Sequence, residues 1–361
     1  MTIVTFGEVM GRFAPEGFLR FSQAMPGSLH VTFAGAEANV AASLAMFGES
    51  ARFVSAVPRN PLGAACLASL QARGIDTSRV LQTDRGRLGL YFLETGANQR
   101  PSNVVYDRDG AAVAVTPSSA YDWPAIFDGA KWFHTTGITP AISADASQCA
   151  LDAVIAARQA GCRVSCDLNF RAKLWRWGEL PPRELAQATM RELLPHVDVV
   201  IANEEDCETV LGIRAADTDV SSGHLSVDRY PEVAGEVLKQ FPNVSHVAIT
   251  LRESLSASHN NWGAMLHCRD SGSYLAPLGA DGEYSPYEIR NIVDRVGAGD
   301  SFAAGLIYAM SQPELANPQT AIHFAVAASC LAHSIVGDFN FSTREEVERL
   351  MGGSASGRVM R

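Results

Sequence analysis

The 361-residue chain lacks several patterns that mark common classes of protein. It has no block of consecutive Lys or Arg residues, and its 29 basic and 39 acidic side chains give a formal charge of −10. Both features argue against nucleic acids and anionic membranes as partners. Aromatic residues make up 8% and charged residues 19%, whereas 47% are hydrophobic, which is typical of a globular protein and not of a disordered chain.

Cysteine pairs and targeting signals are also missing. The seven cysteines are scattered and form no C-x-x-C pair, so the sequence indicates no zinc site, redox couple or haem attachment, and we expect a reducing, cytoplasmic location. The first eight residues contain an acid and no basic region, so no signal peptide is predicted. The uncharged segment 315–337 is interrupted by Pro318 and by two histidines, which favours a buried or amphipathic helix over a membrane span.

Apolar runs alternate with segments of helical composition along most of the chain. Strands are predicted at 3–6, 52–57, 132–136, 163–168, 197–201 and 247–249. Helices are predicted at 37–47, 62–73, 144–160, 183–194 and 204–211. This order predicts a parallel sheet with helices on both faces, and the nearly continuous apolar strands fit that burial.

Two stretches interrupt the alternation and predict a second, smaller sheet. Residues 12–33 and 87–115 have the composition of strands and turns, with antiparallel strands expected at 88–93 and 103–108. We interpret this sheet as a lid over a cleft, since such insertions exclude water from active sites. A sheet that serves only dimerisation is the alternative. On either interpretation, residues 1–350 form one domain and 351–361 form a tail.

The glycine-rich turn D-R-V-G-A-G-D at 294–300 carries the clearest chemical signal. It follows a predicted strand and precedes an alanine-rich helix, so free backbone N–H groups and the helix dipole should form an anion site there. Gly297 and Gly299 permit close approach of the backbone to a ligand, and Asp300 places a carboxylate at the mouth of the pocket. A base next to an anion hole suits phosphoryl transfer. The alternative is that Asp300 only caps the helix.

Two other classes of protein fit the sequence less well. The chain has no Walker A loop and no G-x-G-x-x-G element, and only Gly7-x-x-x-Gly11 follows the first predicted strand. An NAD-dependent oxidoreductase would need that fingerprint. A sugar-binding regulator without activity would keep the cleft and lose the base, and Asp300 argues against it.

The complete set of motifs resembles the ribokinase-like (PfkB) carbohydrate kinases. The turn at 294–300 matches the family's D-x-x-G-A-G-D signature, and A-G-A-E-A-N-V-A at 34–41 matches its glycine-rich sugar-binding element. Further segments are most similar to the branch that acts on 2-keto-3-deoxygluconate: G-L-Y at 89–91, Y-D-R at 106–108, G-I-T-P at 137–140, D-L-N-F-R-A-K-L-W at 167–175 and H-S-I-V-G-D-F-N at 333–340. The resemblance covers nearly the whole chain. It implies a three-layer α/β fold, with a mainly parallel central sheet between helices and a small β-sheet lid.

The resemblance also implies an activity and a set of site residues. The expected reaction is phosphorylation of 2-keto-3-deoxygluconate, or a close sugar acid, by ATP and Mg²⁺ on the primary hydroxyl, which gives the 6-phosphate. Fructokinase or another PfkB-type sugar kinase is the alternative, and a homo-oligomer is expected. Asp300 would be the base and Gly297, Ala298 and Gly299 the anion hole. The residues implied to hold the sugar acid are Gly35, Asn39, Tyr91, Tyr106, Arg108 and Arg171. Those implied to face ATP are Asn169, Arg252, Gly297, Gly299, Ala328, His333 and Asn340.

Residue type supports part of this assignment. The planar fork of Arg108 or Arg171 suits a carboxylate substrate, whereas a neutral hexose needs no such group. Two motifs depart from the family pattern. The N-x-x-E element ends in Asp206, which is therefore assigned to magnesium through water, and the T-x-G-x-x-G element has neither glycine at 250–255.

Overall fold

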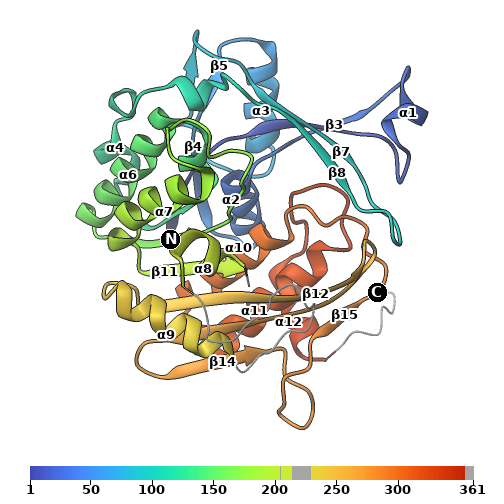
Figure 1. The fold of residues 1–361 in the computed structure, drawn as a ribbon, viewed down its shortest axis with the longest axis vertical. Helices are drawn as coiled ribbons and strands as arrows, with labels where there is room; N and C mark the ends of the chain where they lie inside the picture. The colour runs from blue at the N-terminus through green and yellow to red at the C-terminus, as the bar shows by residue number, and fades with distance from the viewer. Residues whose placement is uncertain (204, 214–228, 354–361) are drawn as a thin grey trace.

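The computed structural model of the protein describes residues 1–203, 205–213 and 229–353. Its main sheet has the strand order β14-β13-β12-β11-β10-β9-β1-β4, with β15 paired to β13 (Figure 1). The parallel strands are β1 (Thr2–Phe6), β4 (Ser50–Val54), β9 (Ala130–Thr136), β10 (Arg163–Asp167), β11 (Val199–Asn203) and β12 (His246–Ser256). The predicted parallel sheet is thus confirmed for these six strands.

One end of the main sheet is antiparallel, which the alternation of strands and helices did not reveal. Strand β12 turns back directly into β13 (His259–Cys268), and β14 (Gly272–Ala276) and β15 (Tyr287–Ile289) both pair with β13. No helix separates these strands in the chain, so they meet as hairpins and antiparallel neighbours.

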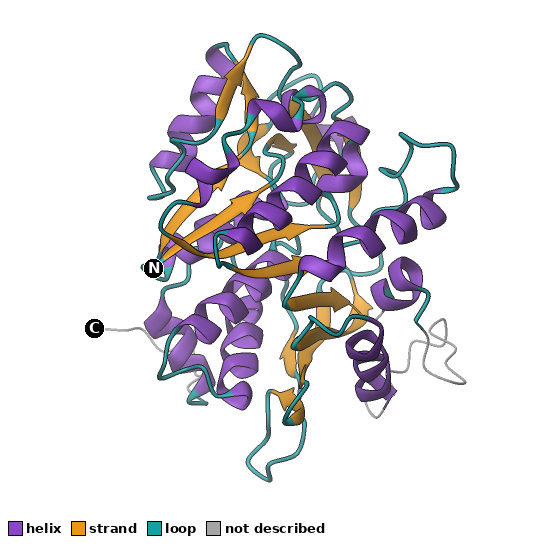
Figure 2. Cartoon of the chain, turned by 90° about the vertical axis from the view of Figure 1, so that its left-hand side faces the viewer, coloured by secondary structure: helices purple, strands orange, loops and turns teal. Residues whose placement is uncertain are grey.

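Helices cover both faces of the main sheet, as Figure 2 shows. One buried core lies against α4 (Trp123–Phe127), α6 (Ala144–Gln159), α7 (Pro182–Leu193), α8 (Asp206–Leu211) and α9 (Tyr230–Gln240). The other lies against α2 (Ala36–Met46), α3 (Pro61–Gln71), α10 (Ala298–Ser311), α11 (Pro318–Ala332) and α12 (Arg344–Met351). Successive strand residues alternate between the cores, so that Ile3 packs in one and Val4 in the other. The predicted three-layer fold is confirmed.

A separate four-stranded sheet has the order β3-β2-β7-β8 and projects from the layered domain (Figure 1). Its strands are β2 (Met10–Ala14), β3 (His30–Ala34), β7 (Gly89–Glu94) and β8 (Asn103–Asp107), which agrees with the small sheet predicted from 12–33 and 87–115. The central pair β2–β7 is parallel, whereas the outer pairs are antiparallel. Residues 112–115 lie outside this sheet, in a short 3-10 helix (Ala112–Val115) that packs into the main core.

The remaining elements are short. They are β5 (Ala56–Pro58), β6 (Leu81–Thr83), α1 (Phe21–Ala24), α5 (Thr139–Ile142) and two further 3-10 helices (Ser118–Ala120 and Leu194–His196). Within the described residues, no helix has the length and apolar character that a membrane span requires. Of the two kinds of helix predicted for that uncharged segment, buried or amphipathic, α11 is the buried one. Glu204, which the predicted helix at 204–211 included, and residues 354–361 of the predicted tail lie outside the described residues.

Candidate active site

A cavity of about 410 Å³ lies where the small sheet meets the carboxyl ends of the central strands. The volume is in the range of small-molecule sites. The small sheet contributes Met10, Tyr91, Val104 and Tyr106 to its lining. The start of α2 contributes Gly35 and Asn39, and the start of α10 contributes Gly297, Ala298, Gly299 and Asp300. The sequence elements at 34–41, 89–91 and 294–300 therefore meet around one cavity.

The glycine turn forms the amino end of α10. Gly297 has φ +85°, and a Cβ atom there would lie 2.1 Å from the carbonyl oxygen of Asp338, so only glycine fits. A Cβ atom on Gly299 would meet nothing within 4 Å. The N–H groups of the first helical turn have no helical acceptor, and they stand at the positive end of a 14-residue helix. The geometry is that of an anion site open to the cavity.

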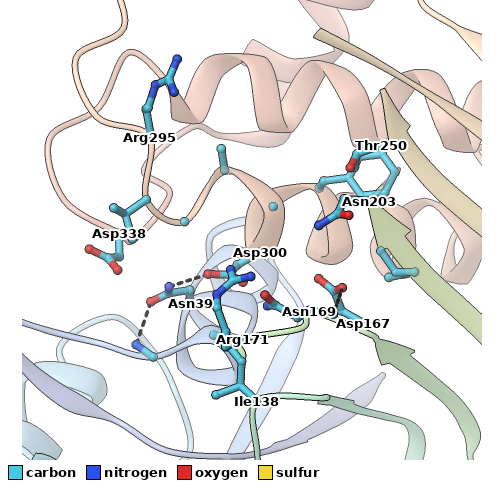
Figure 3. A pocket seen from close by; sticks show the side chains of 18 of the residues that line it. Asn39, Ile138, Asp167, Asn169, Arg171, Asn203, Thr250, Arg295, Asp300 and Asp338 are labelled. Atoms are coloured by element: carbon cyan, nitrogen blue, oxygen red, sulfur yellow. Dashed lines mark hydrogen bonds between the residues drawn. The ribbon is translucent and has the colours of Figure 1, made fainter. Parts of the chain in front are cut away.

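Asp300 faces the cavity and is not a helix cap. The N-cap position is Gly297, and the Asp300 carboxylate instead accepts a hydrogen bond from Asn39 Nδ2 at 2.6 Å (Figure 3). Burial raises the pKa of Asp300 to about 7, although the Asn39 hydrogen bond opposes that rise. A carboxylate whose pKa lies near neutrality is suited to accept a proton.

The position of Asn39 depends on contacts that the sequence did not reveal. Asn39 Oδ1 accepts the N–H of Gly35 at 3.2 Å. A buried Glu37 carboxylate oxygen accepts from Thr136 Oγ1 at 2.8 Å, Thr136 N at 3.0 Å and Thr139 Oγ1 at 2.7 Å. These bonds attach the first turn of α2 to the end of β9. Glu37 is part of the quoted G-A-E motif, which was its only signal.

Arg171 lies in the cavity beside Asp300, as Figure 3 shows. Its Nη1 donates to the carbonyl oxygen of Phe170 at 2.9 Å, and it forms no ion pair with any described carboxylate. Its charge lowers the pKa values of Asp300, Asp167 and Asp206, against the larger effect of burial. A guanidinium in this position can bind an anionic group of a ligand.

Arg108 lies elsewhere, although the sequence assigned it to the same role. It is buried in an ion pair with Glu8 and is absent from the cavity lining. Its guanidinium carbon lies 5.5 Å from the ring centroid of Tyr106, which does line the cavity. To bind a substrate carboxylate, Arg108 would have to leave Glu8. Its substrate role therefore stays a prediction.

Two buried carboxylates lie near the ends of neighbouring strands: Asp167 ends β10, and Asp206 begins α8 just after β11. Asp167 Oδ1 accepts the N–H of Asn169 at 3.1 Å, and Asp206 accepts those of Phe170 and Asn203, both at 3.2 Å. Burial raises the pKa of Asp206, and burial together with the Asp206 and Asp300 charges raises that of Asp167 well above its usual range. Asp167 was missed as a site residue, although it opens the quoted D-L-N-F-R motif.

These oxygen donors fit a magnesium ion carried by a phosphate ligand. The described residues contain no group of three or more His, Cys, Asp or Glu side chains placed to hold a metal by themselves. Mg²⁺ usually takes one or two protein carboxylates, several waters and substrate phosphates. Asp206 and Asp167 meet that requirement.

The strands β12 and β13 line the far end of the cavity. Thr250, Arg252, Asn260 and Trp262 lie there together with Arg295 and His333. The predicted Asn169 also lines the cavity, but it lies between Asp300 and Asp167 (Figure 3). The indole N–H of Trp262 and the Nε–H of Arg295 are buried without an acceptor among the described residues. Residues 250–256 lack the two glycines and continue as part of strand β12. Their pairing with β13 extends to the last pair, Ser256 with His259.

Two of the residues that the sequence assigned to the nucleotide, Ala328 and Asn340, do not line the cavity. The Ala328 carbonyl accepts from Ser301 Oγ at 3.1 Å, and Asn340 Oδ1 accepts the N–H of Ser342 at 2.9 Å.

Comparison with known proteins identifies the family. A family model described as pfkB family carbohydrate kinase matches residues 2–251 and 270–342. The chain belongs to this family. The predicted family is thereby confirmed, and the oxidoreductase alternative is wrong. The protein is a sugar kinase that uses ATP.

Individual relatives agree with this assignment. A 2-dehydro-3-deoxygalactonokinase of Haloferax volcanii is 31% identical over 355 residues, which cover 98% of each chain. An Escherichia coli fructokinase is 26% identical over 79% of each chain. The crystal structure of a 2-dehydro-3-deoxygluconokinase from Thermotoga maritima is 44% identical, with a TM-score of 0.87, and the match covers 98% of this chain and all of that one.

Proposed function

We propose that this kinase transfers the γ-phosphate of MgATP to the primary hydroxyl of a 2-keto-3-deoxy sugar acid and releases the 6-phosphate. The family gives the class of reaction. The names of the Haloferax and Thermotoga proteins support a 2-keto-3-deoxy acid as the substrate class.

The observation that carries the choice of a sugar acid is the position of Arg171. Its guanidinium lies beside Asp300 in the cavity and has no carboxylate partner among the described residues. Charge-assisted hydrogen bonds from such a group are worth about 1.5 to 3 kcal/mol. A sugar acid supplies a charged acceptor for this exposed guanidinium, whereas with a neutral sugar the group keeps only water and the Phe170 carbonyl.

Each catalytic role follows from one feature of the site. Asp300 accepts the proton of the attacking hydroxyl, since its carboxylate faces the cavity and the pKa is raised to about 7. The N–H groups of Gly297–Gly299 receive the charge that develops on the transferred phosphoryl group. Magnesium, when bound with the nucleotide, neutralises phosphate charge, and Asp206 with Asp167 would hold it, partly through water.

The small sheet acts as a lid in this proposal. Met10, Tyr91, Val104 and Tyr106 all project from it into the cavity, which a sheet used only for dimerisation would not need. Closure over the sugar would exclude water from the transferred phosphoryl group. The homo-oligomer and the cytoplasmic location stay predictions.

A substrate panel tests the proposal directly. Purified protein would be assayed for ADP release with 2-keto-3-deoxygluconate, 2-keto-3-deoxygalactonate, fructose and ribose, and the product position would be read by phosphorus NMR. We expect the acids to give the highest kcat/KM and a phosphate ester on C6. Preferential use of fructose would instead place the enzyme among the fructokinases, and a different ester position would contradict the proposed product.

A further inference from the structure

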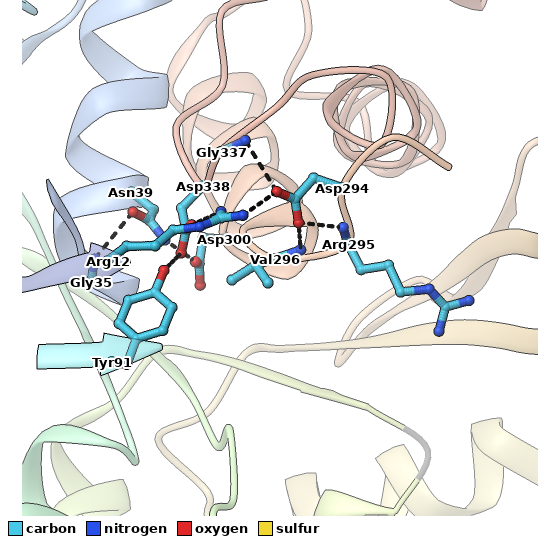
Figure 4. A network of polar contacts seen from close by, with 10 residues as sticks. All are labelled: Arg12, Gly35, Asn39, Tyr91, Asp294, Arg295, Val296, Asp300, Gly337 and Asp338. Carbon is cyan, nitrogen blue, oxygen red and sulfur yellow. Dashed lines mark hydrogen bonds and ion pairs between the residues drawn. The ribbon is translucent and has the colours of Figure 1, made fainter. Parts of the chain in front are cut away.

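A buried ion network joins the small sheet to the turn that carries Asp300 (Figure 4). Arg12, on β2, contacts the carboxylates of Asp294 and Asp338, and only 4% of its side chain is exposed. Asp294 begins the glycine turn, and Asp338 lies in the loop between α11 and α12. One arginine of the small sheet therefore binds both loops behind the anion site.

A second side chain of the small sheet binds the same loop. Tyr91 is the register partner of Arg12 across the β2–β7 pair, and its hydroxyl donates to Asp338 Oδ2 at 2.7 Å. Paired residues on neighbouring strands point to the same face of a sheet, so both side chains reach one carboxylate. Tyr91 also lines the cavity. The β2–β7 pair therefore both lines the cavity, through Tyr91, and contacts the loops that support the glycine turn, through Arg12 and Tyr91.

Both aspartates fix the main chain of the turn. Asp294 Oδ1 accepts the N–H groups of Arg295 at 2.8 Å and Val296 at 3.2 Å, and its Oδ2 accepts that of Gly337 at 3.1 Å. The carbonyl oxygen of Asp338 packs directly on Gly297, where a Cβ atom would be 2.1 Å away. A displacement of either aspartate would therefore move the N–H groups of Gly297–Gly299.

We propose that Arg12 is a positioning residue for phosphoryl transfer, which holds the Gly297–Asp300 turn in its productive geometry through Asp294 and Asp338. Because Arg12 belongs to the small sheet, the anion site is correctly shaped only while that sheet is docked on the cavity. A guanidinium suits the role, since its planar fork directs N–H donors at two carboxylates in fixed directions, whereas an ammonium group is a compact point charge without that fixed geometry. The inference rests on the role proposed above for the turn.

The substitution Arg12→Lys tests this role with the charge retained. We expect kcat to fall by about 10- to 100-fold, because a displacement of about 1 Å in a positioned group can cost 10²-fold. The KM values for sugar and ATP should stay close to those of the wild type, since the ground-state contacts are kept. A matched control is Arg87→Lys, in the solvent-exposed ion pair with Asp107 beside the same sheet, which should leave kcat unchanged.

A second variant keeps the test informative if the lysine substitution is accommodated poorly. Arg12→Ala leaves two buried carboxylates without a cation, and millimolar guanidinium ion should restore part of its kcat, but not that of Asp300→Asn. Thermal melting would give the folded fraction of each variant.

The outcomes separate this inference from the proposed function. A wild-type kcat for Arg12→Lys, or a loss of activity that only follows the folded fraction and is not rescued by guanidinium, would overturn the positioning role. If one of these Arg12 results is found while Asp300→Asn is inactive in the same series, only the role of Arg12 is wrong and the proposed function stands. If Asp300→Asn is active, the proposed role of the turn itself is wrong.

Discussion

The two sides of the cavity differ in how far the protein satisfies its own polar groups. On the α10 side, Asp300 is bonded to Asn39, and Asp294 and Asp338 are bonded to Arg12. On the β12–β13 side, Trp262 Nε1 and Arg295 Nε are buried without an acceptor among the described residues. Buried donors usually have partners. We propose that MgATP supplies acceptors on the β12–β13 side, whereas the carboxylates of the α10 side already have protein partners.

Substitution of the base should have the largest effect on the α10 side. Asp300→Asn keeps the size of the side chain and removes the proton acceptor, so kcat should fall by about 10² to 10⁴-fold. Binding of ATP and sugar, measured by calorimetry, should change much less. If Asp300→Asn had nearly wild-type turnover, proton transfer would not occur at Asp300 on the α10 side of the cavity.

The pH dependence should report the same carboxylate. Burial raises the pKa of Asp300 to about 7, and the base must be deprotonated, so kcat/KM should rise about tenfold per pH unit below 7 and level off above it. Residual activity of Asp300→Asn should lack this inflection. A wild-type profile that is flat from pH 5 to 8 would contradict the assignment.

Ionisation of Asp300 should lower the stability of the folded protein as the pH rises, whereas it raises kcat/KM. The pKa is higher in the folded than in the unfolded protein, so the folded state binds more protons and loses stability as pH rises between the two values. The melting temperature of Asp300→Asn should therefore exceed that of the wild type at pH 8 and match it near pH 4. Calorimetry at both pH values would check this difference, and an equal shift at both would contradict it.

Magnesium dependence probes the nucleotide side. If Asp206 orders the water shell of the ion, Asp206→Asn should raise the magnesium concentration for half-maximal activity by about tenfold, as for other groups in the outer coordination sphere. The neighbouring exposed Glu205 offers a matched control, because Glu205→Gln changes the same charge one residue away. Identical magnesium titrations for the two variants would reject the role of Asp206.

Much of the fold and part of the site followed from short segments of sequence. The glycine turn was read from its own residues, the Gly35–Asn39 element from its resemblance to a family motif, and the strands of the small sheet from their composition. Partners distant in sequence were not predictable. Glu8 lies 100 positions from Arg108, and Arg12 lies 282 positions from Asp294 and 326 from Asp338. Pairing of such residues depends on how sheets and loops pack.

The nucleotide side shows the same limit in its backbone. The motif comparison indicated only that the two glycines of the T-x-G-x-x-G element were absent. The structure shows the consequence, which is that β12 continues to Ser256 before the chain turns. Ala328 and Asn340 were assigned through motif position, and their side chains instead pack within the protein. A sequence motif can identify the segment that lies near the nucleotide, but the packing of that segment decides which of its side chains reach the cavity.

We propose that Arg171 recognises a substrate carboxylate next to the base. The most direct test of this role is the ratio of kcat/KM for 2-keto-3-deoxygluconate to that for fructose, measured for the wild type and for Arg171→Gln. We predict a high ratio for the wild type and a ratio lower by about 10- to 100-fold for the variant, as expected for the loss of about 1.5 to 3 kcal/mol with the acid alone. A ratio that is the same in both proteins would contradict the claim.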